Sequence, residues 1–216
     1  MEPLLEIRGP AAPLPLDDIN TDMIAPTRPR AHLANTKISE REFDAAALFA
    51  PLRFDASGAE NPSFVLNQPG FRAAKIILSG RNFGCGSSRE QAVWLLADFG
   101  IRCIIAQSYG GIFYDSCFKN GILPVILPAN TIGELMQEAA DGGGEQFFTV
   151  NVAERSVVSP SGKAIKFDLP EFRRAALLSG VDDIDMTLRR SNEISAFVDR
   201  DRTARPWIYL AKPQRA

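Results

Sequence analysis

The segment GRNFGCGSSREQAVW, residues 80–94, brings three glycines, two serines, two arginines and a glutamate together just before an apolar run. Glycines this close together are typical of positive φ or of a close backbone approach. Backbone amides that turn into a helix N-terminus form an anion site, because unpaired N–H groups and the helix dipole act at the same place. Gly84, Cys85 and Gly86 would supply such amides. Arg89 adds a planar guanidinium suited to a carboxylate or phosphate, so the segment predicts a site for a small anion.

A helix cap is the structural interpretation of the same segment. Ser87 followed three residues later by Glu90 has the spacing of a capping box, in which the serine hydroxyl accepts from a backbone amide. Thr131 and Glu134 show the same spacing without a crowding of glycines before it. The cap leaves the crowding of glycines before Ser87 unexplained, which favours the anion site.

The sequence excludes three known motifs for phosphate binding or nucleophilic catalysis. A P-loop needs a lysine directly after its last glycine, where this chain has Ser87. A dinucleotide-binding loop needs glycine at the position of Arg89, and the GxSxG nucleophile elbow is absent. His32 is the only histidine, so a serine–histidine hydrolase would depend on it, and an exposed loop position is the favoured interpretation.

The three cysteines, Cys85, Cys103 and Cys117, indicate free thiols in a reducing compartment. Their number is odd and no CxxC pair occurs, so neither a disulfide frame nor a zinc site is predicted. Separations of 18 and 14 residues match no local iron–sulfur motif. Cys85 lies between two glycines near a helix start, a setting that can activate a thiol, so a nucleophilic role stays open.

The composition is that of an ordinary globular chain. Its 216 residues are 45% hydrophobic and 23% charged, with a net charge of −2. This charge implies no general attraction to nucleic acid or to an anionic membrane. The start of the chain lacks a signal-peptide pattern, and no apolar run reaches the roughly 18 residues that a membrane helix needs. We therefore expect a cytoplasmic protein without nucleic-acid or membrane partners.

The order of the expected elements is that of an α/β domain. Buried strands are expected near residues 73–80, 101–108 and 122–128, and helices near residues 88–100, 112–119 and 131–141. The alternation predicts a largely parallel sheet covered by helices, with Gly100 ending the helix before it. The flanking segments predict a turn at TDMIAP, a helix over 38–49, a hairpin or meander over 147–169 and two helices over 170–200.

Longer stretches around these motifs resemble the swivelling domain of the aconitase superfamily. As a free-standing chain, the sequence is similar to the small subunits of 3-isopropylmalate dehydratase, the isopropylmalate isomerase of leucine biosynthesis. The resemblance rests on GRNFGCGSSRE and DFGIRCIIAQSYGGIFYDSCFKNGILPV, with INTDMIAP, ENPSFVLNQP and GVDDIDMTL elsewhere in the chain. It implies one swivelling β/β/α domain over residues 1–216 and hydro-lyase activity.

The resemblance also implies a reaction shared with a partner. A large subunit would carry a [4Fe–4S] cluster on three cysteines, and this chain, binding no metal itself, would close the active site over it. The substrate would be a malate-type dicarboxylate. 2-Isopropylmalate would be dehydrated to isopropylmaleate and rehydrated to 3-isopropylmalate, with the open iron of the cluster as Lewis acid.

The same resemblance assigns roles to single residues. Ser87 would be the base that removes the carbon-bound proton, its alkoxide stabilised by the helix N-terminus and Arg89. Arg89 would also hold a substrate carboxylate, with a hydrogen bond added by Ser88. Thr21 and Asp22 of the TDMI motif would lie at the substrate site, Asp22 as a supporting acid, although composition alone favours an Asx turn for Asp22.

Two departures from the family pattern bear on the substrate. Gln91 stands where the family has histidine after SSRE, and the substrate loop at about residues 27–42, expected to be mobile, has no arginine in the family's register. The cations that could replace it are Arg28, Arg30, Lys37 and Arg41. A hydro-lyase for dimethylmalate or citramalate, and a non-catalytic dicarboxylate-binding module, stay open as alternatives.

Overall fold

A four-stranded parallel sheet lies at the centre of the fold in the computed structural model, which describes residues 2–26, 47–181 and 183–209. Its strands, in spatial order, are β2 (Ala11–Leu14), β3 (Ile76–Ser79), β4 (Cys103–Ala106) and β5 (Leu123–Ile126). The register places Ile76 opposite Ala11 on one side and Cys103 on the other. The three strands expected from the apolar runs are thus confirmed, and TDMI follows a fourth.

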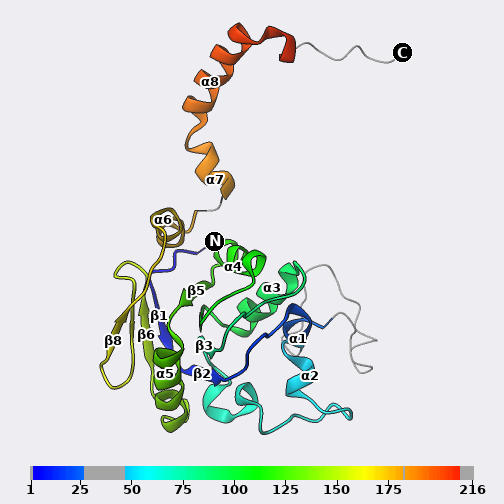
Figure 1. Cartoon of the computed structure of the whole chain (residues 1–216), viewed down its shortest axis with the longest axis vertical. Coiled ribbons are helices and arrows are strands. Elements are labelled where there is room, and N and C mark those ends of the chain that lie inside the picture. The colour runs from blue at the N-terminus through cyan, green and yellow to red at the C-terminus, as the bar shows by residue number, and fades with distance from the viewer. Residues whose placement is uncertain (1, 27–46, 182, 210–216) are drawn as a thin grey trace. The chain divides into compact units, whose positions relative to one another are not determined.

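Both faces of this sheet are covered. Ile77 and Ile104 point into one apolar cluster, which they share with α3 (Glu90–Phe99) and α4 (Gly111–Lys119). Ile76 and Ile105 point into a second cluster, shared with α5 (Ala129–Asp141) and another sheet (Figure 1). Successive residues of a strand face opposite sides, so strands covered on both sides read as continuous apolar runs. The expected α/β class with a parallel sheet covered by helices is confirmed.

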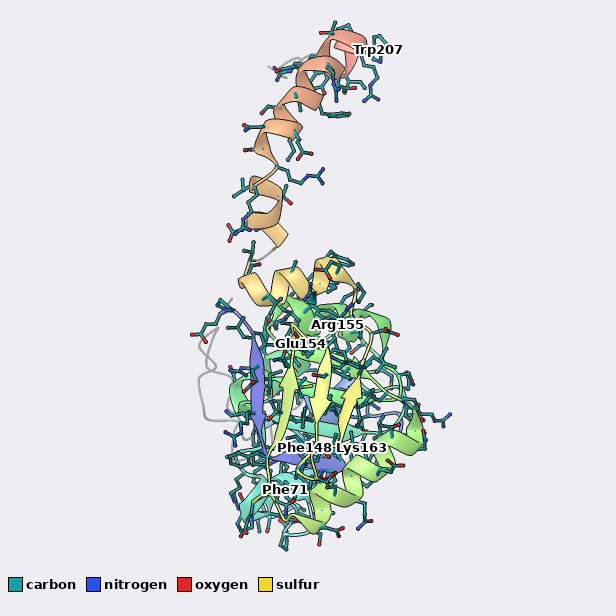
Figure 2. The ribbon with its side chains drawn as sticks, turned by 90° about the vertical axis from the view of Figure 1, so that its left-hand side faces the viewer. Phe71, Phe148, Glu154, Arg155, Lys163 and Trp207 are labelled. Atoms are coloured by element: carbon teal, nitrogen blue, oxygen red, sulfur yellow. The ribbon has the colours of Figure 1, made fainter. Side chains whose placement is uncertain are left out.

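A second, antiparallel sheet forms the outer layer. Its strands, in spatial order, are β1 (Glu6–Gly9), β6 (Phe148–Asn151), β7 (Ser156–Val158) and β8 (Ala164–Lys166). Figure 2 looks onto this sheet, with Glu154 and Arg155 at the β6–β7 turn and Lys163 just before β8. Phe148 and Val150 alternate with half-buried residues along β6, and both are buried with Val157 against the parallel sheet. The meander predicted for 147–169 is confirmed.

The helix ends are partly as expected. Gly100 follows α3 with a φ of 107°, the left-handed conformation predicted for it. The cap predicted from Thr131 and Glu134 is wrong, because α5 begins two residues earlier, at Ala129, with Pro128 before it and no side-chain cap. A further helix, α6 (Glu171–Ser179), follows the antiparallel sheet.

Short helical turns connect β2 to β3. They are α1 (Thr21–Ile24), α2 (Ala50–Arg53), η2 (Val65–Asn67) and η3 (Pro69–Phe71). The expected turn at TDMIAP is one helical turn, because Asn20 Oδ1 accepts from Met23 N at 2.9 Å and caps it. The helix predicted for 38–49 lies largely outside the described residues.

Contacts within the chain divide it into two compact units, residues 1–180 and residues 181–216. The second unit contains α7 (Asp183–Leu188), α8 (Ser191–Ala204) and η4 (Pro206–Tyr209). With α6, the region expected to hold two helices therefore holds three. Within the described parts of the chain, no helix is long and apolar enough to cross a membrane.

Candidate active site

The segment before α1 and the glycine loop run side by side. Because β2 and β3 are parallel neighbours, the chain leaves both at the same edge of the sheet. Four backbone hydrogen bonds then join the continuations: Gly80 N to Leu16 O at 3.1 Å, Asp18 N to Arg81 O at 2.9 Å, Gly84 N to Ile19 O at 2.7 Å and Thr21 N to Cys85 O at 2.9 Å. The TDMI motif and the serine-arginine motif therefore meet at one place.

Glycine is required at Gly84 for two reasons. Its φ is 72°, and a Cβ built there would lie 2.1 Å from Cγ of Phe113. Gly86 also has positive φ, 93°, but with room around it. The amide of Gly84 donates to Ile19 O, so it closes the loop instead of offering an N–H to an anion, contrary to our expectation for this residue. Cys85 is half-buried, and its Sγ donates to Asp18 O at 3.5 Å.

Ser87 is not a helix cap. The structure begins α3 at Glu90, with Arg89 as the residue before it and no side-chain cap, so the predicted capping box is wrong. The physical reason is a turn between Ser87 and the start of α3, in which Arg89 N donates to Ser87 O at 3.0 Å. The Ser87 hydroxyl lies instead 2.9 Å from the hydroxyl of Thr21. Ser87 is exposed, so its Oγ is open to a ligand.

Thr21 lies beneath this serine. The residue is 1% exposed, and its hydroxyl also donates to the carbonyl oxygen of Ser87 at 3.2 Å. The structure thus brings Thr21 and Ser87 together. Burial, however, leaves Thr21 no surface for a direct substrate contact.

Arg89 is tied to α1. Its guanidinium forms an ion pair with Asp22, and Nη1 donates to Ala25 O at 3.1 Å. The Arg89 side chain is 24% exposed and that of Asp22 is 60% exposed. Asp22 therefore lies on the solvent side and holds the guanidinium at the surface, with Ser88 beside it also exposed.

A surface pocket of about 590 Å³ opens next to these residues. It is lined by Ser88, Arg89, Glu90, Gln91, Trp94, Ile112, Ser116 and Lys119. Sequence motifs gave no indication of a site role for Trp94, Ile112 or Lys119. Trp94 lies one helical turn beyond Gln91, a spacing that could have pointed to it, whereas the contribution of α4 depends on how α3 and α4 pack.

Several predicted residues lie outside the described part of the chain. Arg28, Arg30, Lys37, Arg41 and His32 all fall between residues 27 and 46. Within the described residues, no group of three or more His, Cys, Asp or Glu side chains could hold a metal ion. Cys103 and Cys117 are buried, and burial raises the pKa of both thiols.

Comparisons with known proteins show what this chain is similar to. A family model described as the aconitase C-terminal domain matches residues 1–130. The 3-isopropylmalate dehydratase small subunit of Rhodospirillum centenum is 48% identical over 207 residues, which are 96% of this chain and 98% of that protein. The small subunit of Paramagnetospirillum magneticum is 43% identical over 208 residues, 96% of this chain and 100% of that protein. A solved 3-isopropylmalate dehydratase structure from Methanocaldococcus jannaschii shares the fold, with a TM-score of 0.58 and 24% identity over 89% of this chain and 99% of that one.

Proposed function

Because the chain belongs to the aconitase C-terminal domain family and to the 3-isopropylmalate dehydratase small subunits within it, we propose that it isomerises 2-isopropylmalate to 3-isopropylmalate, together with a large subunit. The reaction proceeds through isopropylmaleate and is a hydro-lyase step of leucine biosynthesis. The observation that carries this proposal is the match to such small subunits along nearly the whole chain.

The catalytic iron belongs, in this proposal, to the large subunit. The described residues of this chain do not fit a cluster, since they offer no group of three metal-ligating side chains and two of the three thiols are buried. A [4Fe–4S] cluster on the large subunit supplies a Lewis acid toward the hydroxyl and a carboxylate of the substrate. This chain contributes proton transfer and carboxylate binding.

Ser87 is the base in this proposal. Its hydroxyl is exposed and caps no helix, so a substrate can reach it. The Oγ takes the carbon-bound proton during dehydration and returns a proton during rehydration. A serine alkoxide needs stabilisation, and Ser87 lies just before the N-terminus of α3, where the helix dipole and the first amides favour negative charge.

Arg89 holds one carboxylate of the substrate. Its contacts with Asp22 and Ala25 O fix the guanidinium, which carries five N–H donors and keeps some for a bidentate carboxylate. Ser88 lines the same pocket and adds a hydrogen bond. Asp22 acts by orienting Arg89 and not by touching the substrate.

Residues 27–42 complete the substrate site in this proposal. A dicarboxylate needs a second cationic group, and this segment contains Arg28, Arg30, Lys37 and Arg41. We propose the cytoplasm as the place of action, without nucleic-acid or membrane partners, in keeping with three free thiols and a net charge of −2.

Reconstitution tests this function. The chain is mixed anaerobically with the cluster-loaded large subunit of its own organism and offered 2-isopropylmalate, dimethylmalate and citramalate separately, with absorbance of the unsaturated intermediate as readout. Preference for isopropylmalate supports the proposal. Preference for a smaller malate overturns the substrate but keeps the chemistry. No turnover with any of them, combined with dicarboxylate binding by the isolated chain, indicates a non-catalytic module.

A serine substitution tests the base. Ser87→Ala is expected to abolish turnover while the two subunits still assemble, because the exposed hydroxyl contributes little to the fold. Ser179→Ala, on α6, is the matched control and is expected to leave turnover unchanged. Full activity of the Ser87→Ala complex would remove Ser87 from the mechanism.

A further inference from the structure

Thr21 and Ser87 are joined by an unusual pair of contacts. The Thr21 hydroxyl lies within 2.9 Å of the Ser87 hydroxyl and within 3.2 Å of the Ser87 carbonyl oxygen, although 66 positions separate the residues. Thr21 is 1% exposed, whereas Ser87 is exposed. A covered hydroxyl thus supports the open hydroxyl that we propose as the base.

The surroundings of Thr21 hold it in place. Thr21 N donates to Cys85 O at 2.9 Å, so its backbone is bonded to the loop that carries Ser87. Its carbonyl accepts from Ala25 N at 2.9 Å within the capped turn α1. A β-branched side chain has few χ1 rotamers, which limits the positions open to Oγ1. The hydroxyl therefore meets Ser87 in a fixed geometry.

A hydroxyl has one proton and two acceptor positions. When Thr21 donates to the Ser87 carbonyl, the contact between the hydroxyls requires the Ser87 proton to point at Thr21 Oγ1. When Ser87 has lost its proton, only Thr21 can donate in that contact. The same two distances therefore fit both protonation states of Ser87.

We propose, building on the function above, that Thr21 is a positioning residue whose hydroxyl turns its proton from the Ser87 carbonyl to the Ser87 alkoxide. The exposed Ser87 hydroxyl first gives its proton to solvent water, and the resulting alkoxide accepts the charge-assisted hydrogen bond from Thr21 until it takes the carbon-bound proton of the substrate. The new Ser87 O–H then donates to Thr21 Oγ1, and Thr21 returns to the carbonyl. Thr21 keeps its own proton throughout, and rehydration reverses the steps.

Burial makes this arrangement effective. A covered hydroxyl is screened from water, so its proton is directed at the two Ser87 oxygens that lie within hydrogen-bonding distance of it. Hydrogen bonds to a charged group are also stronger where solvent is excluded. An exposed threonine at the same distance would divide its proton between Ser87 and water.

The test uses the reconstituted two-subunit enzyme and three variants. Thr21→Val keeps the shape but removes the hydroxyl, Thr21→Ser keeps the hydroxyl, and Thr21→Ala is a second hydroxyl-free variant. Loss of a hydrogen bond to a charged group lowers kcat about 10- to 100-fold in the Val and Ala variants, with KM changed less than about twofold. Thr21→Ser is expected to retain most of kcat.

The pH profile separates positioning from a structural role. A hydrogen bond to the charged form of a group lowers its pKa, so loss of the Thr21 donor moves the rising limb of kcat to higher pH, by about one unit. In the Ser87→Ala background, Thr21→Val is expected to have no further effect, because turnover is already lost. Thermal unfolding and subunit assembly report folding separately.

The outcomes distinguish this inference from the proposed function. If the wild-type complex is active and the Thr21→Val and Thr21→Ala variants keep its kcat and pH profile, the proposed role of Thr21 is overturned and the proposed function is not. Equal loss in the Ser variant also overturns it, because the hydroxyl is then not what matters. A wild-type complex that converts none of the malates contradicts the function itself.

Discussion

Asn82 Nδ2 donates a hydrogen bond of 2.8 Å to Asp18 Oδ1, and both residues have left-handed φ, 58° and 53°. Asp18 N also donates to Arg81 O at 2.9 Å. Non-glycine residues in this conformation store strain, which persists only where other contacts hold them. This contact fixes where the segment leading to Thr21 meets the loop leading to Ser87.

Substitution of Asn82 measures this strain. Asn82→Ala is expected to lower the free energy of unfolding by about 1–3 kcal/mol, because it loses the hydrogen bond and keeps an unfavourable φ. Asn82→Gly loses only the hydrogen bond and is expected to cost less. Urea unfolding of the chain measures both. Arg155, at the β6–β7 turn, has a φ of 51° and gives the control pair Arg155→Ala and Arg155→Gly. These two substitutions are expected to change the free energy of unfolding without changing turnover.

Gly84→Ala is expected to be far more damaging than alanine at another glycine with positive φ. A Cβ at Gly84 meets the Phe113 ring at 2.1 Å, and overpacking adds about 1–3 kcal/mol or more to the cost of the φ. Gly162 has a φ of 86° and nothing within 4 Å of the added Cβ, so Gly162→Ala loses only the free energy of the unfavourable backbone conformation. Comparable losses in the two urea midpoints would show that the ring yields.

The sheet strands were predictable because their burial leaves a strong mark on the sequence. IILS, CIIA and LPVI are short apolar runs, and residues such as Ile76 and Ile77 face the two separate clusters that enclose the parallel sheet. Gly100 was predictable because a left-handed helix end favours glycine. These signals are local, and a single chain is enough to read them.

The contacts of the site were not predictable in the same way. The spacing of Ser87 and Glu90 suits a capping box, yet the helix begins at Glu90, and no local rule places the serine hydroxyl against Thr21. That contact follows from the parallel pairing of β2 with β3, a tertiary feature. The resemblance brought both motifs to one site without saying that Thr21 is buried and Asp22 exposed.

Arg89→Lys is expected to raise KM for isopropylmalate by about tenfold or more in the reconstituted enzyme. A lysine is a point charge that cannot keep the contacts with Asp22 and Ala25 O while also presenting a planar pair of donors to a carboxylate. The control is Arg173→Lys, whose ion pair with Asp115 lies outside the proposed site. An unchanged KM in the Arg89→Lys variant argues against a bidentate carboxylate contact.

Thiol reagents are expected to distinguish Cys85 from the other two cysteines. Cys103 and Cys117 are buried, and burial raises the pKa of both, so neither forms a reactive thiolate in the folded chain near pH 8. Cys85 is half-buried and lies two residues from Ser87. A disulfide reagent is expected to modify one thiol in the native chain and three in denaturant, and Cys85→Ser is expected to remove the native reaction.

Modification of Cys85 is further expected to block turnover, because a bulky adduct beside Ser87 obstructs the substrate. The same reagent is expected to leave the Cys85→Ser enzyme active. Rapid native labelling of all three thiols would instead mean that the clusters enclosing the parallel sheet open readily.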